Sequence, residues 1–206
     1  MVNMRPFTAF EQKNLKFLVN HNVKFTQVEI TPTGLGKGIL DSTAPMRAYF
    51  LENGIHNYEE QLQGQEHKQI KQACILTDAT QFFTKASFYR PNTKKGDPRM
   101  WIYGFGLYTE GNDIHVLFWH EQTLYSINIT HIDIEKCYNS AIITPMQEVL
   151  KAINKEGNSV SEELLGRFRA VKDQWFESEV TADTGIGRTI ESFLGISMNS
   201  DKTPDY

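Results

Sequence analysis

Five short runs of β-branched and aromatic residues between residues 70 and 135 constrain the fold more than any other feature of the sequence. The runs are ACIL, FFTKASFY, MWIYGFGLY, IHVLFW and LYSINITHIDI, with turn signals such as EGND (110–113) and HEQT (120–123) between them. Strand-forming runs at this spacing are typical of an antiparallel barrel or sandwich and not of a parallel sheet. Gly104 and Gly106 fall inside one run, where glycine often marks a bulge or a tight bend in a barrel wall.

Helical patterns flank this β-rich region, and the first lies before it. Residues 7–20 place apolar side chains at helical spacing, and residues 23–30 predict a strand that enters a glycine-rich loop at residues 31–42. A further helix is expected to begin after Ser42 or Thr43, with Pro45 in its first turn, and to stop at Gly54.

The second helical region follows Pro145. GNS (157–159) predicts a joint between two helices, because Ser159 and Glu162 have the spacing of a capping box. ADTG (182–185) predicts a linker into a last helix, RTIESFLG. The expected fold class is therefore α+β, with a central antiparallel β-pseudobarrel and flanking helices.

Composition indicates an ordinary globular protein. The 206 residues are 40% hydrophobic and 22% charged, with a net charge of −4. Two cysteines, Cys74 and Cys137, are too few for a disulfide framework or a zinc cage. The sequence has neither a membrane-length apolar run nor the apolar core of a signal peptide, so we expect a cytoplasmic protein without a membrane partner.

One segment is strongly basic although the chain as a whole is acidic. Residues 85–101 contain five cations opposed only by Asp97; the cations are Lys85, Arg90, Lys94, Lys95 and Arg99. Pro91 and Pro98 stiffen this segment and Gly96 permits a turn, so a projecting loop between two strands is expected. Such a loop could enter a DNA groove, where Arg, Lys, Asn and Asp contact base edges. It could equally be a solvated hairpin that protects a strand edge.

Two other patterns suggest a phosphate-binding loop and a metal site, but neither has the residues that such a site needs. GLGKG (34–38) lacks the spacing of a phosphate-binding P-loop, which leaves a structural turn or a flexible segment that approaches a polyanion. His115 and His120 are five residues apart in strands or turns, without accompanying Cys or carboxylate ligands. We therefore expect no metal site in this part of the chain.

The end of the chain, TGIGRTIESFLGISMNSDKTPDY, carries the most specific motif. It resembles the opening of the catalytic domain in the MvaI/BcnI family of restriction endonucleases. In that family a T-G-x-G-x-T-x-E-x-x-L-G-I helix precedes a metal-binding Pro-Asp and then a Glu-x-Lys. Residues 184–196 match the helix and Pro204-Asp205 match the start of the active site.

The resemblance implies a catalytic role for Asp205 and Mg²⁺ as the cofactor of the complete nuclease. The Glu-x-Lys would lie beyond Tyr206. We therefore expect these 206 residues to be a fragment of a type II site-specific deoxyribonuclease that is inactive alone and needs no cofactor itself.

The preceding residues resemble the B3-like DNA-binding effector domain of EcoRII-like and UbaLAI-like restriction endonucleases. B3-like domains are β-pseudobarrels that hold DNA in the major groove between two segments, here named the N-arm (residues 31–42) and the C-arm (residues 90–101). The resemblance implies a B3-like domain at residues 1–180, and a linker with the start of the nuclease domain at residues 181–206.

The implied function is recognition of a short site in double-stranded DNA, such as CCWGG, in a restriction enzyme. Phosphate contacts are expected from Lys37 and Lys94. Base contacts are expected from Arg90, Asn92, Lys95, Asp97 and Arg99, and the two arms also contribute Thr33 and Trp101. The implied partners are double-stranded DNA and the nuclease domain of the same polypeptide, and a monomer is the working expectation for the oligomeric state.

Two other functions stay open. A modified-cytosine reader of a modification-dependent nuclease would flip the base into an aromatic pocket lined by Tyr89, Trp101, Tyr103 and Trp119. A protein-interaction or dimerisation module would have no role in DNA binding.

Overall fold

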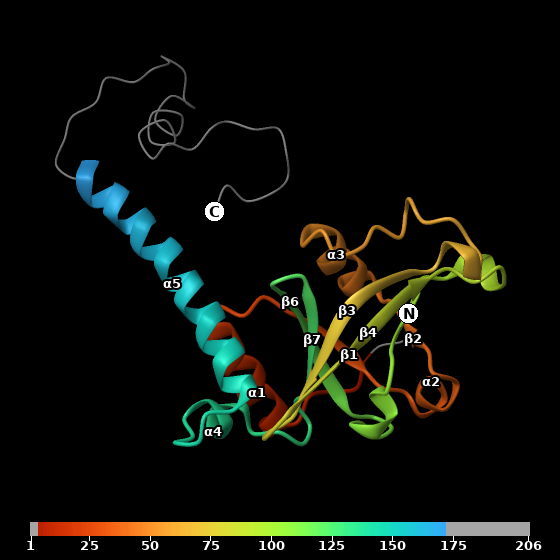
Figure 1. Cartoon of the computed structure of the whole chain (residues 1–206), viewed down its shortest axis with the longest axis horizontal. Helices are drawn as coiled ribbons and strands as arrows, with labels where there is room; N and C mark the ends of the chain where they lie inside the picture. The colour runs from red at the N-terminus through yellow and green to blue at the C-terminus, as the bar shows by residue number, and fades with distance from the viewer. Residues whose placement is uncertain (1–3, 172–206) are drawn as a thin grey trace, which may run out of the picture. The chain divides into compact units, whose positions relative to one another are not determined.

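The computed structural model describes residues 4–171, without the side chains of Lys94, Val160, Ala170 and Val171 (Figure 1). The chain divides into two compact units, Met1–Asn154 and Lys155–Tyr206. The helices of the described part are α1 (Ala9–Asn20), α2 (Pro32–Lys37), α3 (Ala44–Glu52), α4 (Ile134–Tyr138) and α5 (Pro145–Val171), with short 3-10 helices η1 (Gln65–His67), η2 (Lys94–Gly96) and η3 (Phe105–Leu107). The strands are β1 (Thr26–Glu29), β2 (Leu40–Asp41), β3 (Gln69–Leu76), β4 (Gln81–Tyr89), β5 (Arg99–Ile102), β6 (Ile114–His120) and β7 (Thr123–Asn128).

The strands form one curled, half-barrel sheet in the order β1-β6-β7-β3-β4-β5-β2. The predicted α+β class with flanking helices is therefore confirmed, whereas the predicted pseudobarrel stays a prediction because the sheet is a half-barrel. The prediction of a purely antiparallel sheet is wrong, because β3 and β7 pair in parallel. A tight hairpin at Glu121 and Gln122, both with positive φ, returns the chain from β6 into β7, which then lies beside β3 and runs in the same direction.

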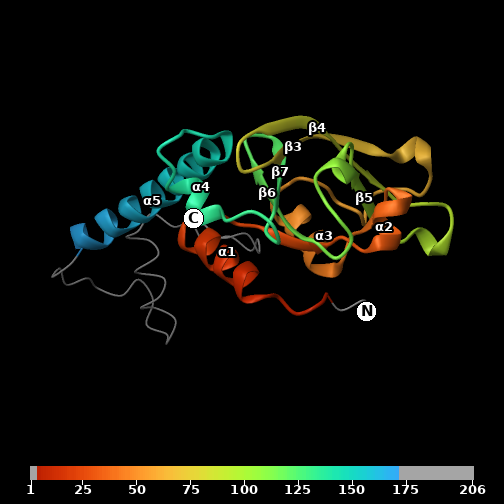
Figure 2. The same cartoon turned by 90° about the horizontal axis from the view of Figure 1, so that it is seen from below.

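Two hydrophobic clusters stabilise the sheet from its two faces. One lies inside the curl and joins the sheet to α3 through side chains such as Phe50, Phe88 and Met100. The other joins the opposite face to α1, α4 and the start of α5, with Leu18 and Leu150 fully buried. Figures 1 and 2 show that α2 lies at the far side of the sheet from α1 and α4. Each edge strand has a helical neighbour, since α3 contacts β1 and α2 contacts β2.

The predicted helices at residues 7–20 and after Thr43 are confirmed as α1 and α3. Thr8 caps α1 with a capping box in which Glu11 returns the hydrogen bond. The first three residues of the predicted strand at 23–30 differ, since β1 begins at Thr26.

Three local predictions are wrong for identifiable reasons. The glycine-rich loop contains a helical turn, α2, and a short strand, β2. The predicted strand at residues 100–108 ends at Ile102, because Gly104 takes a left-handed conformation (φ 76°) and opens the turn of η3. The predicted joint at residues 157–159 lies inside α5, so Ser159 is not a helix cap.

Other predictions fall outside the described residues. These are the linker at 182–185, the last helix, and the proposed boundary between residues 180 and 181. Within residues 4–171 no helix combines the length and the apolar character that crossing a membrane requires.

Candidate nucleic-acid interface

The N-arm begins with a helical turn whose ends are specified by sequence. The Thr31 hydroxyl accepts a hydrogen bond from the Gly34 backbone N–H at 3.0 Å, and Pro32 occupies the first helical position. Gly38 ends α2 in the left-handed conformation at φ 62°. These signals fold the N-arm into a short, defined projection that exposes Thr33 and Lys37.

The N-arm returns to the sheet through β2, which pairs only with β5. Leu40 lies opposite Met100 and Asp41 lies opposite Arg99 in an antiparallel register. The ion pair between Arg99 Nε and Asp41 Oδ1 spans 3.6 Å. This pairing brings the N-arm and the C-arm, far apart in sequence, to one edge of the sheet.

Arg90 holds the loop of the C-arm through hydrogen bonds to backbone carbonyls. Arg90 Nε donates to the Gly96 carbonyl at 2.9 Å, and Arg90 Nη1 donates to the carbonyls of Gln61 at 3.1 Å and Tyr58 at 3.3 Å. Lys95 and Gly96 both have positive φ, which tightens the turn. The Arg90 side chain therefore joins the loop to residues 58–61 and holds Gly96 close to Arg90.

A second set of contacts locks the far end of this loop to the N-arm. The Ser42 backbone N–H donates to the Pro98 carbonyl at 2.9 Å. The Tyr58 hydroxyl donates to the Arg99 carbonyl at 2.9 Å and lies 2.7 Å from the Ser42 hydroxyl. Ser42 and Tyr58 are buried, so these hydrogen bonds fix the relative position of the two arms.

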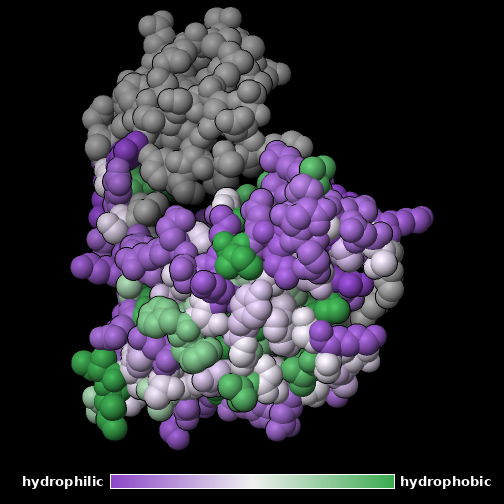
Figure 3. Space-filling model, turned by 45° about the vertical axis from the view of Figure 1, so that its right-hand side comes forward, coloured by the Kyte–Doolittle hydropathy of each residue, from purple (hydrophilic) through white to green (hydrophobic). Residues whose placement is uncertain are grey.

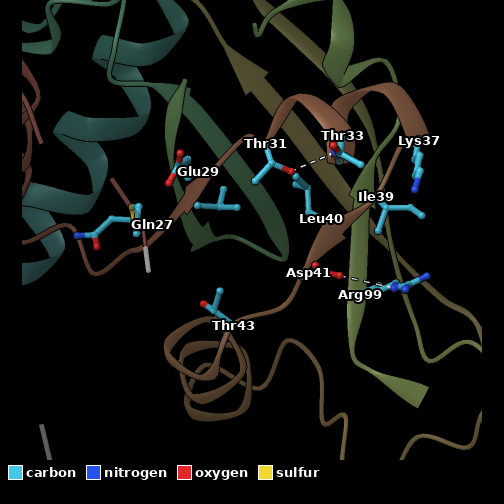
Figure 4. A pocket seen from close by; sticks show the side chains of 13 residues that line it. Gln27, Glu29, Thr31, Thr33, Lys37, Ile39, Leu40, Asp41, Thr43 and Arg99 are labelled. Atoms are coloured by element: carbon cyan, nitrogen blue, oxygen red, sulfur yellow. Dashed lines mark hydrogen bonds and ion pairs between the residues drawn. The ribbon is translucent and has the colours of Figure 1, made fainter. Parts of the chain in front are cut away.

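A pocket of about 400 Å³ opens between the edge strands β1 and β2. Its polar lining comes from β1, the N-arm, the start of α3 and β5 (Figure 4). The residues that line it are Met4, Gln27, Val28, Glu29, Thr31, Thr33, Gly34, Lys37, Ile39, Leu40, Asp41, Thr43 and Arg99. Two cations and two carboxylates thus face one cleft, and Glu29 already accepts the backbone N–H of Arg5 at 2.8 Å.

Arg99 and Asp41 differ sharply in exposure. The Arg99 side chain is 14% exposed, whereas that of Asp41 is 78% exposed. Arg99 Nε is buried without a hydrogen-bond partner among the described residues, since 3.6 Å is too long for one. A buried guanidinium nitrogen without an acceptor is unusual and favours a ligand that supplies one.

The structure brings together three of the predicted DNA-binding residues at the pocket, namely Thr33, Lys37 and Arg99. Asn92, Lys95 and Asp97 are exposed on the adjoining loop, outside the pocket lining. Trp101 is half-buried beneath Gly38 and packs edge-on against Phe105. The Lys94 side chain and Asp205 lie outside the described residues.

Sequence reasoning missed Asp41 as a site residue. Its place opposite Arg99 depends on a two-residue strand that no local pattern marks. Gln27 and Thr43 were missed because they reach the pocket only through the curl of the sheet.

The surface around the site is polar. Figure 3 brings the side that carries α2 forward, and on the face it shows, hydrophobic side chains form separate spots and not one continuous patch. A large protein-protein interface would need a broader apolar centre.

The four aromatic residues of the alternative hypothesis do not line this pocket. Tyr89 is buried, and Trp101 and Trp119 pack against the cluster inside the sheet. Tyr103 is 42% exposed, next to η3. No described residue in the pocket lining is aromatic.

The histidines of β6 show no metal chemistry in the described part of the chain. Fully buried His115 lies 2.9 Å from the Ser126 hydroxyl, and burial lowers the pKa of His115 to about 3. Across residues 4–171 no group of three or more His, Cys, Asp or Glu side chains is placed to hold a metal ion. The Mg²⁺ that the nuclease resemblance implies would depend on Asp205, outside the described residues.

Fold and site together define a curled β-sheet domain with a cleft at its edge that is lined by both cations and carboxylates. Comparison with protein families matches residues 165–206 to the MvaI/BcnI restriction endonuclease family. No curated protein and no solved structure gives a significant match to the chain. The family match supports the nuclease resemblance of the chain end, and the B3-like assignment of the preceding residues remains a prediction.

Proposed function

We propose that residues 4–154 form a B3-like module that recognises a short sequence in double-stranded DNA for a type II restriction endonuclease. The observation that carries this proposal is the convergence of the N-arm and the C-arm at one cleft. Lys37 and Arg99 come from segments far apart in sequence and line the same pocket. The family match at residues 165–206 supports a nuclease context, in which DNA is the substrate.

Within this proposal the residues of the two arms make different kinds of contact with the DNA. Lys37 and Lys95 are exposed cations on the two arms and would contact phosphates. Arg99 would contact a base edge, while Asn92 and Asp97 would contribute further polar contacts from the exposed loop. Arg90 positions the loop through its three backbone carbonyls, and Trp101 supports the end of α2. Lys94 would contact a phosphate as well, and Thr33 would add a DNA contact from the N-arm.

The complete enzyme would use Mg²⁺ and cut DNA through the domain whose family match begins at residue 165. That role rests on Asp205 and on the family match, and it is separate from recognition by the arms.

The test is binding of the whole 206-residue chain to DNA by fluorescence anisotropy at several salt concentrations. Lys37→Ala and Lys95→Ala should each reduce the slope of log K against log salt by about one contact, on specific and random duplexes alike. Lys16→Ala is the matched control, because Lys16 is an exposed lysine on α1 at the far side of the sheet. Equal slopes for all four proteins, or no salt-dependent binding, would rule out this surface.

A further inference from the structure

The arrangement of Asp41 and Arg99 carries a more specific inference about what the cleft recognises. A carboxylate in a DNA interface is repelled by phosphates, so an exposed one must face groups that donate hydrogen bonds. Asp41 is such a carboxylate, exposed over 78% of its side chain and lining the pocket beside Arg99. Among the base edges, cytosine presents an amino donor at N4 in the major groove.

Arg99, in contrast, must face groups that accept hydrogen bonds. Its Nε is buried and lies 3.6 Å from Asp41 Oδ1, an ion-pair distance that is too long for a hydrogen bond. The remaining two nitrogens of a guanidinium form a fork that matches two acceptors side by side. Guanine presents such a pair, O6 and N7, on its major-groove edge.

One base pair can satisfy both the acceptor of Asp41 and the donors of Arg99. In a C·G pair the cytosine N4 amino group donates to guanine O6, so the two groups lie about 3 Å apart. Asp41 and Arg99 place an acceptor and a cationic donor at directly opposed positions of the β2–β5 ladder, with 3.6 Å between Asp41 Oδ1 and Arg99 Nε. The pair therefore carries the donor–acceptor pattern that complements the major-groove edge of C·G.

We propose that Asp41 and Arg99 act as one unit that selects a C·G base pair, an inference that rests on the proposed function. Arg99 donates to guanine O6 and N7. Asp41 stays beside Arg99 through the ion pair and accepts from the N4 amino group of the paired cytosine. A methyl group on that N4 nitrogen would compete for the space that Asp41 occupies, so N4-methylation of this cytosine blocks binding.

The experiment begins with selection of bound duplexes from a random 20-bp library by the wild-type chain. In the enriched duplex each guanine is then replaced singly by 7-deazaguanine, which lacks N7, and each cytosine by N4-methylcytosine. At one base pair both replacements should weaken wild-type binding, each by about 5-fold or more.

The variants assign these losses to residues. Arg99→Ala should lose its sensitivity to 7-deazaguanine at that pair, and Asp41→Ala its sensitivity to N4-methylcytosine. Lys16→Ala and Glu60→Ala are the controls, since they remove one charge of each sign from exposed positions outside both arms and should keep both sensitivities. Because each comparison is made within one variant, a general loss of affinity or stability cancels.

The outcomes separate the two proposals. Selection without enrichment of any sequence overturns sequence-specific DNA recognition, and this inference with it. Enrichment with no base pair sensitive to both analogues overturns the inference alone. So does a pair at which Arg99→Ala and Asp41→Ala keep the wild-type sensitivities.

Discussion

The backbone N–H of Ser42 donates a hydrogen bond to the carbonyl of Pro98 at 2.9 Å, and so joins the end of the N-arm to the C-arm. The bond is part of a buried cluster in which the Tyr58 hydroxyl contacts both Ser42 and Arg99. The geometry of the cleft therefore depends on a tyrosine that lies outside both arms.

Tyr58→Phe tests this dependence. The change removes one hydroxyl and leaves the Arg99 carbonyl and the buried Ser42 hydroxyl without that partner. We expect a loss of roughly 1–3 kcal/mol in the free energy of unfolding, measured by urea denaturation. DNA affinity should fall as well, because the Arg99 backbone loses its anchor.

Tyr103→Phe is the matched control for this variant. Tyr103 is 42% exposed, and its change should alter the free energy of unfolding by no more than about 0.5 kcal/mol. If the two variants unfold at the same urea concentration, the cluster does not stabilise the arms.

Two glycines of the N-arm should respond in opposite directions to alanine. Gly38 has φ 62°, so Gly38→Ala forces a left-handed alanine at a cost of roughly 1–2 kcal/mol. Gly36 lies within α2 with open space around its position for a methyl group, so Gly36→Ala should stabilise by roughly 0.5–1 kcal/mol. Melting temperatures of the two variants check this, and a stabilised Gly38→Ala would contradict the C-cap of α2.

Stability should fall in acid because of Glu11. Its carboxylate is fully buried and accepts two hydrogen bonds from the Arg5 guanidinium, which lower the pKa of Glu11 to about 2. A carboxyl whose folded pKa lies below its unfolded value stabilises fully above about pH 4.5, and this contribution is lost as the pH falls toward 2. The difference corresponds to about 3 kcal/mol at neutral pH.

Glu11→Gln should therefore lose most of this stability at pH 7 and show a shallower fall between pH 5 and 3. Glu60→Gln, at an exposed position, should keep the wild-type pH profile. Urea unfolding at pH 7, 5 and 3 measures both, and parallel curves for the wild type and Glu11→Gln would show that the Arg5 contact does not stabilise the fold.

Much of the sheet could be predicted from sequence, because its strands are continuous runs of β-branched and aromatic residues with turn signals between them. The parallel pairing of β3 with β7 could not, because it depends on where the hairpin after His120 returns the chain. The helical turn α2 had its signals in Thr31, Pro32 and Gly38, which the surrounding glycines obscured. Uninterrupted α5 shows that weak helix formers at 157–159 are tolerated within a longer amphipathic helix.

The charged residues of the site could be predicted from the sequence, but the contacts that they make could not. Clustered cations marked the C-arm, but sequence does not reveal that Arg90 is engaged by three carbonyls. Nor does it reveal Asp41, whose position opposite Arg99 exists only through the register of β2 and β5. Residues that are distant in sequence and joined by a two-residue strand leave no periodic pattern.

The central claim is that the two arms bind DNA, and NMR mapping tests it most directly. Backbone amide signals of the ¹⁵N-labelled chain would be followed while the duplex enriched from the random library is added, with a scrambled duplex as control. The account predicts that the largest shift changes fall within residues 31–43 and 90–99 and occur with the enriched duplex. Changes concentrated in α1 and α4, or equal changes with both duplexes, would contradict it.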